Sequence, residues 1–385
     1  MPITRFSFPT TIHFGPGARK LVGAQLAERG LKRPLVVTDK GLAALPIVAE
    51  LMADLAAAGL APALFGGVFG NPTASQAMAG AAAFRAHRAD GVVGIGGGAA
   101  LDVAKIVGVI ANGGGTALEY AYDHPNVRSI GVDVPWFVAL PTTSGTGSEV
   151  GRSAVISEDD THIKRIVFSP NILAKTVFAD PELTLGLPAK VTAAVGMDAL
   201  SHNLEAYCAP FHHPMADGIA VEGMRLVKQW LPVAVADGSN IEARAQMMVA
   251  SALGATAFQK GLGAMHSLSH PCSANLNTHH GLTNGVVMPY VLAWNRSALQ
   301  DKMTRLAAYL DLPKPSYDAV LNWILELRRQ IGIPATLAEL GVQAAHADAF
   351  AQQAFDDPST GGNPLPMTPA KFAQLYRNCI EGSGL

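Results

Sequence analysis

The chain has 385 residues, 49% of them hydrophobic and only 15% charged, against about 25% charged in an average globular protein. Its net charge of −2 provides neither a basic stripe for nucleic acid nor a polybasic membrane patch, so we expect neither partner. The length predicts two domains or one large one, and the apolar composition suits a large core and buried surface between subunits.

Cysteine use and the N-terminus indicate a cytoplasmic protein. The three cysteines, Cys208, Cys272 and Cys379, are widely spaced and form no CxxC pair, which fits a reducing compartment. Residues 1–14 lack a charged head followed by an apolar run, so no signal peptide is expected. The uncharged stretch at 55–84 is interrupted by Pro62 and by Asn71-Pro72, and we interpret it as helix end, strand, turn and helix start instead of a membrane span.

The first half of the chain alternates between short apolar runs and helical patterns. Strands are predicted at 34–38, 62–69, 91–95 and 136–140, and helices at 42–58, 73–89 and from about 100. This alternation predicts βαβ units and a parallel sheet.

The second half is rich in Ala, Leu and Met and has helical periodicity. Long helices are predicted at 188–209, 214–236, 241–276 and 284–295. We therefore predict an α/β dinucleotide-binding domain at 1–184 and an all-helical domain at 185–385.

Two turns that follow predicted strands are suited to a nucleotide. Gly96-Gly97-Gly98 opens a helix, where free N–H groups favour a diphosphate, although a plain tight turn explains the glycines equally well. The turn at 141–149 offers five hydroxyls and two glycines, or it simply caps a helix. Ligands of open α/β sheets bind at this edge. Asp39 ends the first of these strands and suits a ribose 2′-hydroxyl, although an ordinary turn residue is the stronger reading on this position alone.

The helical half contains an acid–imidazole cluster. Asp198 and His202 are four residues apart, and so are His266 and His270, which puts each pair on one helix face. His280 follows in a Gly-flanked turn. Nitrogen and oxygen donors without thiolate indicate a transition-metal site. Any four of these residues could close such a site, the spacing does not choose between His279 and His280, and structural histidines are the alternative.

The motifs together resemble the iron-containing (group III) alcohol dehydrogenases along nearly the whole chain. The resemblance is carried by segments 39–41, 71–73, 96–105, 141–149, 196–207, 261–270, 280–284 and 288–289. It implies an N-terminal dinucleotide-binding domain, a C-terminal helical domain of the dehydroquinate-synthase-like plan, a site in the cleft between them, and a homodimer or higher homo-oligomer.

The resemblance also implies roles for individual residues. Asp198, His202, His266 and His280 fall on the family's four metal positions, whereas His270 falls near the substrate as a candidate proton relay or an inert imidazole. The positions at or near nicotinamide-dinucleotide contacts are Asp39, Asn71, Gly97, Gly98, Asp102, Thr142, Thr143, Thr146, Lys164 and Leu183. Ala99 replaces a common Ser, and His279 replaces a common Pro, which adds a second imidazole there.

The implied activity is an NAD(H)-linked oxidoreductase that interconverts a small alcohol, diol or hydroxy acid and its aldehyde or ketone. Fe²⁺ is the expected metal, with Zn²⁺ or another divalent transition metal as an alternative, and it would polarise the substrate oxygen. Asp39 favours NAD(H) over NADP(H). Two rival readings are a metal-independent reductase of the maleylacetate reductase type and a non-catalytic nucleotide-binding protein with a structural metal.

Overall fold

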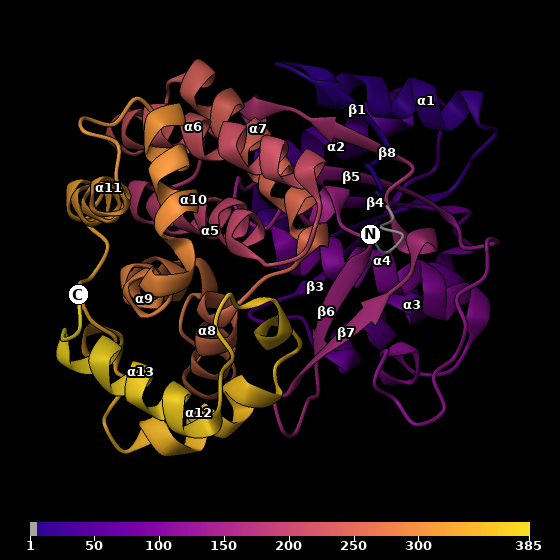
Figure 1. The fold of residues 1–385 in the computed structure, drawn as a ribbon. Helices are drawn as coiled ribbons and strands as arrows, with labels where there is room; N and C mark the ends of the chain where they lie inside the picture. Colours follow the sequence, from indigo (N-terminus) through magenta and orange to yellow (C-terminus); the bar gives the residue numbers. More distant parts are fainter. Residues whose placement is uncertain (1–5) are drawn as a thin grey trace. The chain divides into compact units, whose positions relative to one another are not determined.

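The computed structural model describes residues 6–385, which divide into two compact units (Figure 1). The α/β unit contains Phe8–Thr143 and Gly147–Leu185, and the helical unit contains residues 6–7, Ser144–Thr146 and Gly186–Leu385. The expectation about a signal peptide concerns residues 1–14, of which 1–5 lie outside the described residues.

The α/β unit is built on a parallel sheet. Its strands are β1 (Thr11–Phe14), β2 (Pro34–Asp39), β3 (Ala63–Val68), β4 (Gly91–Gly96), β5 (Trp136–Pro141), β6 (Ser153–Ser157), β7 (Lys164–Phe168) and β8 (Thr176–Ala179). Within residues 6–385 the six-stranded sheet has the order β1-β8-β5-β4-β2-β3, and β6 and β7 form a separate antiparallel ribbon. The helices are α1 (Val22–Glu28), α2 (Pro46–Ala57), α3 (Ala74–His87) and α4 (Gly98–Gly113). The predicted α/β class is confirmed.

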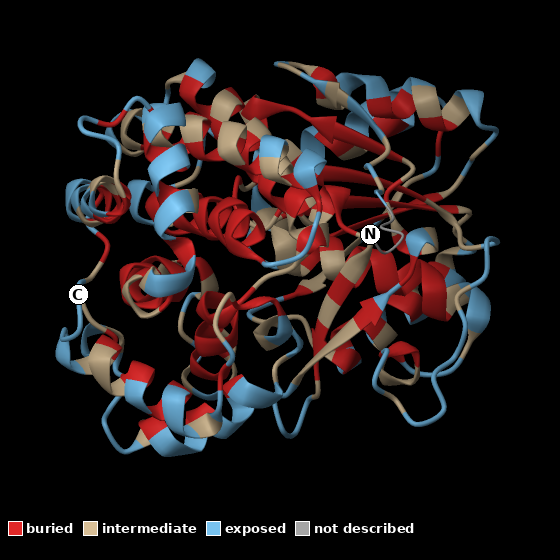
Figure 2. Cartoon of the chain, viewed as in Figure 1, coloured by how far each residue is buried: buried red, intermediate tan, exposed pale blue. Residues whose placement is uncertain are grey.

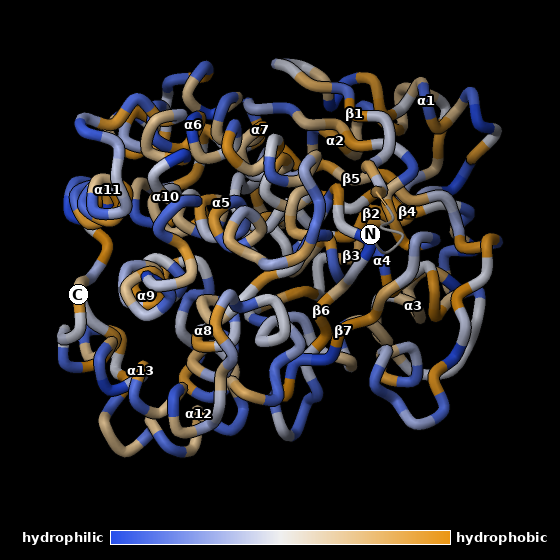
Figure 3. Tube along the Cα trace, viewed as in Figure 1, coloured by the Kyte–Doolittle hydropathy of each residue, from blue (hydrophilic) through white to orange (hydrophobic). Residues whose placement is uncertain are grey.

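Hydrophobicity places the central strands in the core of the α/β unit. Figure 3 shows apolar residues concentrated in β2, β4 and β5, and Val36 of β2, which pairs with Val93 of β4, is fully buried. Strands that are apolar throughout are expected where helices cover both faces of a parallel sheet. Because β3 and β4 lie on opposite sides of β2, the strand order reverses between β2 and β4.

Several element boundaries differ from those expected. The helix predicted at 42–58 begins only at Pro46, because a proline suits the first turn of a helix but not its interior. The strands β1, β6, β7 and β8 had no prediction. They are four or five residues long, and runs that short carry little periodic signal.

The helical unit is built around the buried helix α5 (Ala189–Cys208). Its helices are α5 (Ala189–Cys208), α6 (Pro214–Ala236), α7 (Ile241–Ala257), α8 (Ala264–Leu276), α9 (His280–Trp294), α10 (Arg296–Tyr309), α11 (Tyr317–Gln330), α12 (His346–Asp356) and α13 (Pro369–Glu381). The single helix predicted at 241–276 is wrong. Gly261 has φ +138°, a conformation that helices exclude, so the chain ends α7 and restarts at α8.

Within residues 6–385 the longest apolar helices fall short of what a membrane crossing requires. The uncharged stretch at 55–84 divides into the end of α2, strand β3, a turn and most of α3, in the order expected.

Candidate metal centre and dinucleotide site

The central helix α5 carries polar side chains where the core is otherwise apolar. Every residue from Thr192 to Cys208 is buried (Figure 2), and this run includes Asp198, His202 and Glu205. Burying a carboxylate without a partner is costly. Three ionisable groups on one buried helix therefore indicate that polar partners or a bound ion compensate them.

Two further helices bring their first turns to the same place. Helix α8 begins after Gly263 and carries His266 and His270, and α9 begins at His280. A glycine suits position 263, because a Cβ there would lie 3.1 Å from Glu205 Oε1. A glycine at this position therefore avoids a tight contact between α8 and the Glu205 side chain of α5.

The side chains of these helices converge on one point. One donor atom each of Asp198, His202 and His266 lies within 4.8 Å of the others. His280 lies slightly farther out, with its Nε2 3.6 Å from Asp198 Oδ1 and its ring 5.2 Å from that of His266. The four residues implied by the resemblance are therefore neighbours, although only three form the tight group.

Each of the three imidazoles uses its Nδ1 in a hydrogen bond. His266 Nδ1 lies 2.6 Å from Glu205 Oε2, and His202 Nδ1 lies 3.2 Å from the carbonyl oxygen of Gly145. Carboxylate and carbonyl oxygens only accept, so each Nδ1 carries the proton. The opposite nitrogen, Nε2, then keeps its lone pair for a metal.

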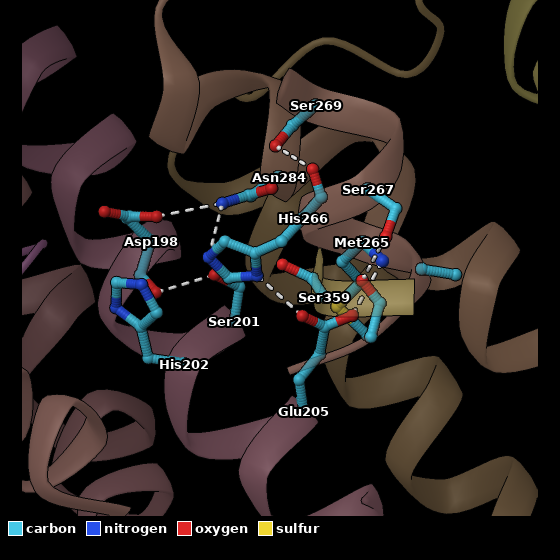
Figure 4. Close-up of polar contacts among 12 residues, drawn as sticks. Asp198, Ser201, His202, Glu205, Met265, His266, Ser267, Ser269, Asn284 and Ser359 are labelled. Carbon is cyan, nitrogen blue, oxygen red and sulfur yellow. Dashed lines mark hydrogen bonds and ion pairs between the residues drawn. The ribbon is translucent and has the colours of Figure 1, made fainter. Parts of the chain in front are cut away.

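His280 follows the same rule through a serine. Its Nδ1 lies 3.1 Å from Ser269 Oγ, and that hydroxyl donates its hydrogen to the carbonyl of His266 (Figure 4). Because Ser269 has one hydrogen to give, it accepts from His280 Nδ1. All three tautomers therefore present Nε2 as a donor atom, which is the form that metal binding needs.

Asn284 marks the centre of the site. Its Nδ2 donates to Asp198 Oδ1 at 2.9 Å and lies 3.4 Å from His266 Nε2 (Figure 4). The same Nδ2 lies 3.2 Å from His280 Nε2. Its Oδ1 is buried and has no hydrogen-bond partner among residues 6–385. Three acceptors thus surround one electropositive amide group. A divalent cation can interact with the lone pairs of all these acceptors at once, so the same set of atoms suits a metal ion.

The pKa values of His202 and His266 are shifted in opposite directions. Burial lowers the pKa of His202 to about 4, with Asp198 opposing the shift. Burial alone would also lower the pKa of His266, but Glu205 and Asp198 raise it above its ordinary value. A metal at this site would displace any proton on Nε2, so its binding depends on pH.

The two histidines whose roles were open have distinct surroundings. His279 is exposed and caps α9, where its Nδ1 accepts from the amide of Leu282 at 3.3 Å. His270 stacks on His280 at 5.1 Å and shares its Nδ1 proton with Asp357 Oδ2 at 2.6 Å. Burial raises the pKa of Asp357, but His270 and the amide of Ser359 lower it to about 2, so this carboxylate is ionised at neutral pH.

In the α/β unit, four sequence-predicted segments lie at one edge of the sheet. Parallel strands end on the same side, so the carboxyl edge carries Asp39 at the end of β2, Gly97 after β4, Thr142 after β5 and the turn after β8. Ligands of open α/β sheets bind where the strand order reverses. Here that point lies between Asp39 and Gly97, because β2 and β4 are neighbours with β3 on the far side.

Two of these turns are in direct contact. The amide of Thr142 donates to the carbonyl of Gly96 at 3.0 Å, and a Cβ placed at Gly97 would lie 3.3 Å from the side chain of Thr143. Gly97 precedes Gly98 at the start of α4, where N–H groups are free to bind an anion. Asp39 Oδ1 accepts from the amide of Leu42 at 2.8 Å.

The remaining sequence-predicted cofactor residues have other settings. Asn71 lies in the turn after β3, Lys164 begins β7, and Leu183 is buried in the short 3₁₀ helix Pro181–Thr184. Thr146 belongs to the segment grouped with the helical unit. The carboxylate of Asp102 faces Ser148, Lys105 and the amide of Val155.

Sequence reasoning missed several residues of the metal centre. Asn284 follows His280 by four residues, so the same helical spacing that paired the histidines was available. Glu205 lies three residues after His202 in an apolar helix, which is also a readable signal. Asp357 had none, because it contacts His270 from 87 residues away.

Comparisons with known proteins agree with this geometry. Residues 9–181 match the family model of iron-containing alcohol dehydrogenases, and residues 192–380 match that of the family's C-terminal part. The chain is 38% identical to a 4-hydroxybutyrate dehydrogenase of Cupriavidus necator, covering 97% of this chain and 98% of the relative. It is 36% identical to an NAD-dependent methanol dehydrogenase of Bacillus methanolicus, covering 98% and 100%.

A solved structure of a 1,3-propanediol oxidoreductase superposes with a TM-score of 0.94 at 33% identity, covering 98% of this chain and 100% of the other. Both halves of the chain are thus matched, in sequence and in fold. The chain belongs to the iron-containing alcohol dehydrogenase family.

Proposed function

We propose that this enzyme is a metal-dependent, NAD(H)-linked dehydrogenase that interconverts a small terminal alcohol and its aldehyde. The observation that carries the proposal is the convergence of Asp198 with histidines whose Nδ1 atoms are all engaged. A purely structural cluster has no need to leave every Nε2 with its lone pair. Fe²⁺ is the proposed ion, and Zn²⁺ suits the same donors.

Asp198, His202, His266 and His280 would hold the ion. Bound there, it would act as a Lewis acid toward the substrate oxygen, an effect worth several kcal/mol. The surrounding residues keep the site in order. Glu205 accepts from His266 Nδ1 and from the amide of Met265, both at 2.6 Å, and therefore fixes ring and helix together.

We assign His270 to proton transfer. The ionised Asp357 accepts from His270 Nδ1 at 2.6 Å, which leaves Nε2 to take up or release a proton. The side chain of His270 is 19% exposed, so the proton has access to water. Asp357 itself is held by the amide of Ser359 at 2.8 Å.

NAD(H) is the proposed cofactor, and it would accept or supply the hydride. Asp39 stands at the point where the strand order reverses, and its Oδ2 lies near Gly96, where a Cβ would be 3.6 Å away. A carboxylate there binds a ribose 2′-hydroxyl and repels a 2′-phosphate. Gly97 and Gly98 would take the diphosphate.

We propose 4-hydroxybutyrate as the first substrate to test, since the relative at 38% identity carries that name. Methanol and 1,3-propanediol, named for two other similar proteins, are the next candidates. All three substrates have a primary alcohol, which is the group that the proposed site would bind.

A homodimer is proposed as well. Strand β1 ends the sheet, and its outer edge pairs with no other strand within residues 6–385. Its side chains Ile12 and Phe14 are 38% and 50% exposed. An apolar edge strand left open invites pairing with a second chain, and Ile12→Lys should yield monomers in light scattering.

The test is turnover with defined metals. The purified chain is stripped with a chelator, reloaded anaerobically with Fe²⁺, Zn²⁺ or Mn²⁺, and mixed with NADH and a panel of aldehydes that includes succinic semialdehyde. We expect NADH oxidation, followed at 340 nm, only in the reloaded samples.

The rival readings give different results. A metal-independent reductase would oxidise NADH equally well after chelation, as expected of the maleylacetate reductase type. A nucleotide-binding protein would bind NADH but show no turnover with any metal. Either result would overturn the proposal.

A further inference from the structure

A lysine in the apolar helix α4 has an unusual environment. The side chain of Lys105 is fully buried, and its Nζ donates to Ser148 Oγ at 2.8 Å, to the carbonyl of Ser153 at 2.6 Å and to Asp102 Oδ1 at 3.5 Å. An ammonium has three hydrogens, so every donor has an acceptor. Burial lowers the pKa of Lys105, and Asp102 opposes that shift.

The carboxylate of Asp102 is committed to the same network. Its Oδ1 accepts from Ser148 Oγ at 2.6 Å, and its Oδ2 accepts from the amide of Val155 at 2.9 Å. Asp102 and Lys105 are three residues apart, so they share a face of α4. Both side chains are therefore directed at neighbouring backbone and at Ser148.

The network joins three segments of the α/β unit. Asp102 and Lys105 belong to α4, Ser148 begins the short 3₁₀ helix Ser148–Val150, and Ser153 and Val155 belong to β6. The turn between β5 and that 3₁₀ helix is also held at its start, because Thr142 donates to Gly96 at 3.0 Å. One end of the hydroxyl-rich turn is thus fixed against the end of β4, and the other end against the N-terminal half of α4.

Stability alone does not account for a buried ammonium. Moving such a charge out of water costs several kcal/mol, and apolar residues of similar volume often replace buried ion pairs without loss. A methionine at position 105 would pack among the apolar residues around α4. What it would not supply is the directional bond to Ser148 and β6, so the lysine contributes defined geometry.

We infer that Lys105 and Asp102 are positioning residues that hold the turn after β5 and the β6–β7 ribbon in place for the dinucleotide. The inference rests on the proposed function. The network sets the distance between the Gly97-Gly98 turn and the Thr142-Thr143 turn, and it aligns the ribbon that carries Lys164. It preorganises the diphosphate site without touching the ligand, which lowers the cost of ordering on binding.

The test compares two buried lysines in the full-length chain. Lys105→Met removes the network, and Lys260→Met is the matched control. Lys260 is equally buried and donates to Asp217 and to the carbonyl of Tyr207, but it lies in the helical unit. For each variant we would measure the Kd for NADH and for ADP by fluorescence and calorimetry, the thermal midpoint, and the metal content.

We expect Lys105→Met to raise the Kd for NADH and for ADP by about tenfold or more, the equivalent of one hydrogen bond to a charged group. Lys260→Met should lower the thermal midpoint similarly and leave both Kd values within about twofold of the wild type. In turnover, Lys105→Met should raise KM for NADH while kcat at saturating NADH stays unchanged.

The inference is overturned if Lys105→Met binds NADH like the wild type, or if Lys260→Met weakens binding as much. Should Lys105→Met not fold, Ser148→Ala decides. It removes one hydroxyl and should raise the Kd about threefold, and an unchanged Kd would refute the inference. A wild type that binds no NADH at all would instead refute the proposed function.

Discussion

The two units of this enzyme build their candidate sites from different materials. In the helical unit, side chains from α5, α8 and α9 converge, and the backbone serves mainly to place them. In the α/β unit, the candidate site consists of strand ends, glycine turns and a helix N-terminus, where backbone groups would bind the dinucleotide. Replacing one residue should therefore abolish the first site but only weaken the second.

The difference also concerns what lies behind each site. Carboxylates and carbonyls hold the imidazoles of the metal centre, so its supporting groups are in contact with the proposed ligands themselves. Behind the dinucleotide turns is the network of Lys105 and Asp102, which acts through loops. Three predictions separate the two arrangements and a fourth concerns stability; they are ordered from the largest expected effect to the smallest.

His266→Ala should eliminate metal retention and turnover together. Loss of a Lewis acid worth several kcal/mol reduces kcat/KM by about a thousandfold or more. Metal content by plasma mass spectrometry and NADH oxidation at 340 nm measure both effects. The Kd for NADH should stay at the wild-type value, because the α/β unit is untouched. Full turnover by a demonstrably metal-free His266→Ala protein would refute the role of the metal.

Glu205→Gln should weaken metal binding by about 10- to 100-fold, the usual cost of losing a carboxylate behind a histidine ligand. A glutamine oxygen accepts from one of Met265 and His266 but not from both with the same strength. Competition with a chromophoric chelator gives the affinity. Glu222→Gln, at a partly exposed carboxylate that pairs with Arg225, is the control, and an equal loss there would remove Glu205 from the metal centre.

Asp39→Ala should change cofactor preference and leave metal content intact. Removing the carboxylate takes away a hydrogen bond to the ribose and the repulsion of a 2′-phosphate. We expect the ratio of Kd for NADPH to Kd for NADH to fall by roughly 10- to 100-fold. An unchanged ratio would show that Asp39 only caps the turn at Leu42, where its bond is 2.8 Å long.

Glu149→Gln should have the smallest effect, on stability alone. Burial raises the pKa of Glu149 to about 7 from its ordinary value of 4.5, with the backbone and Lys105 opposing the shift. Between these values the unfolded chain loses its proton first, so the contribution of Glu149 to stability is complete below pH 4.5 and is lost as pH rises through 7.

The variant removes this dependence. The free energy of unfolding is measured in urea at constant ionic strength. Between pH 5 and pH 8 that of the variant should rise relative to that of the wild type by on the order of 2 kcal/mol. Parallel curves for the two proteins would mean that Glu149 is ionised throughout and that Lys105 balances it.

Much of the fold follows from local pattern. The apolar runs of β2, β4 and β5 and the helical periodicity of α5 and α6 were predicted within one or two residues. Strands β1, β6, β7 and β8 were not, because strand pairing is non-local and four or five residues show no clear alternation. The break at Gly261 was missed because a glycine is tolerated within a helical pattern.

Part of the candidate metal centre could be predicted from the sequence. Spacing of four residues identified Asp198 with His202 and His266 with His270, but spacing alone could not say which imidazoles meet. In the structure His280 joins the cluster near Asp198, whereas His270 turns to Asp357. The choice depends on how α8 and α9 pack against α5.

The sequence by itself determined the kinds of atoms available: nitrogen and oxygen donors in one half, and glycine and hydroxyl turns after strands in the other. Which nitrogen of each ring is protonated, and which carboxylate supports it, was decided by tertiary contacts such as Glu205 with His266, 61 residues apart. The physical reason is that side-chain chemistry is local, whereas the direction of a lone pair depends on the partner that the fold brings to the other side of the ring.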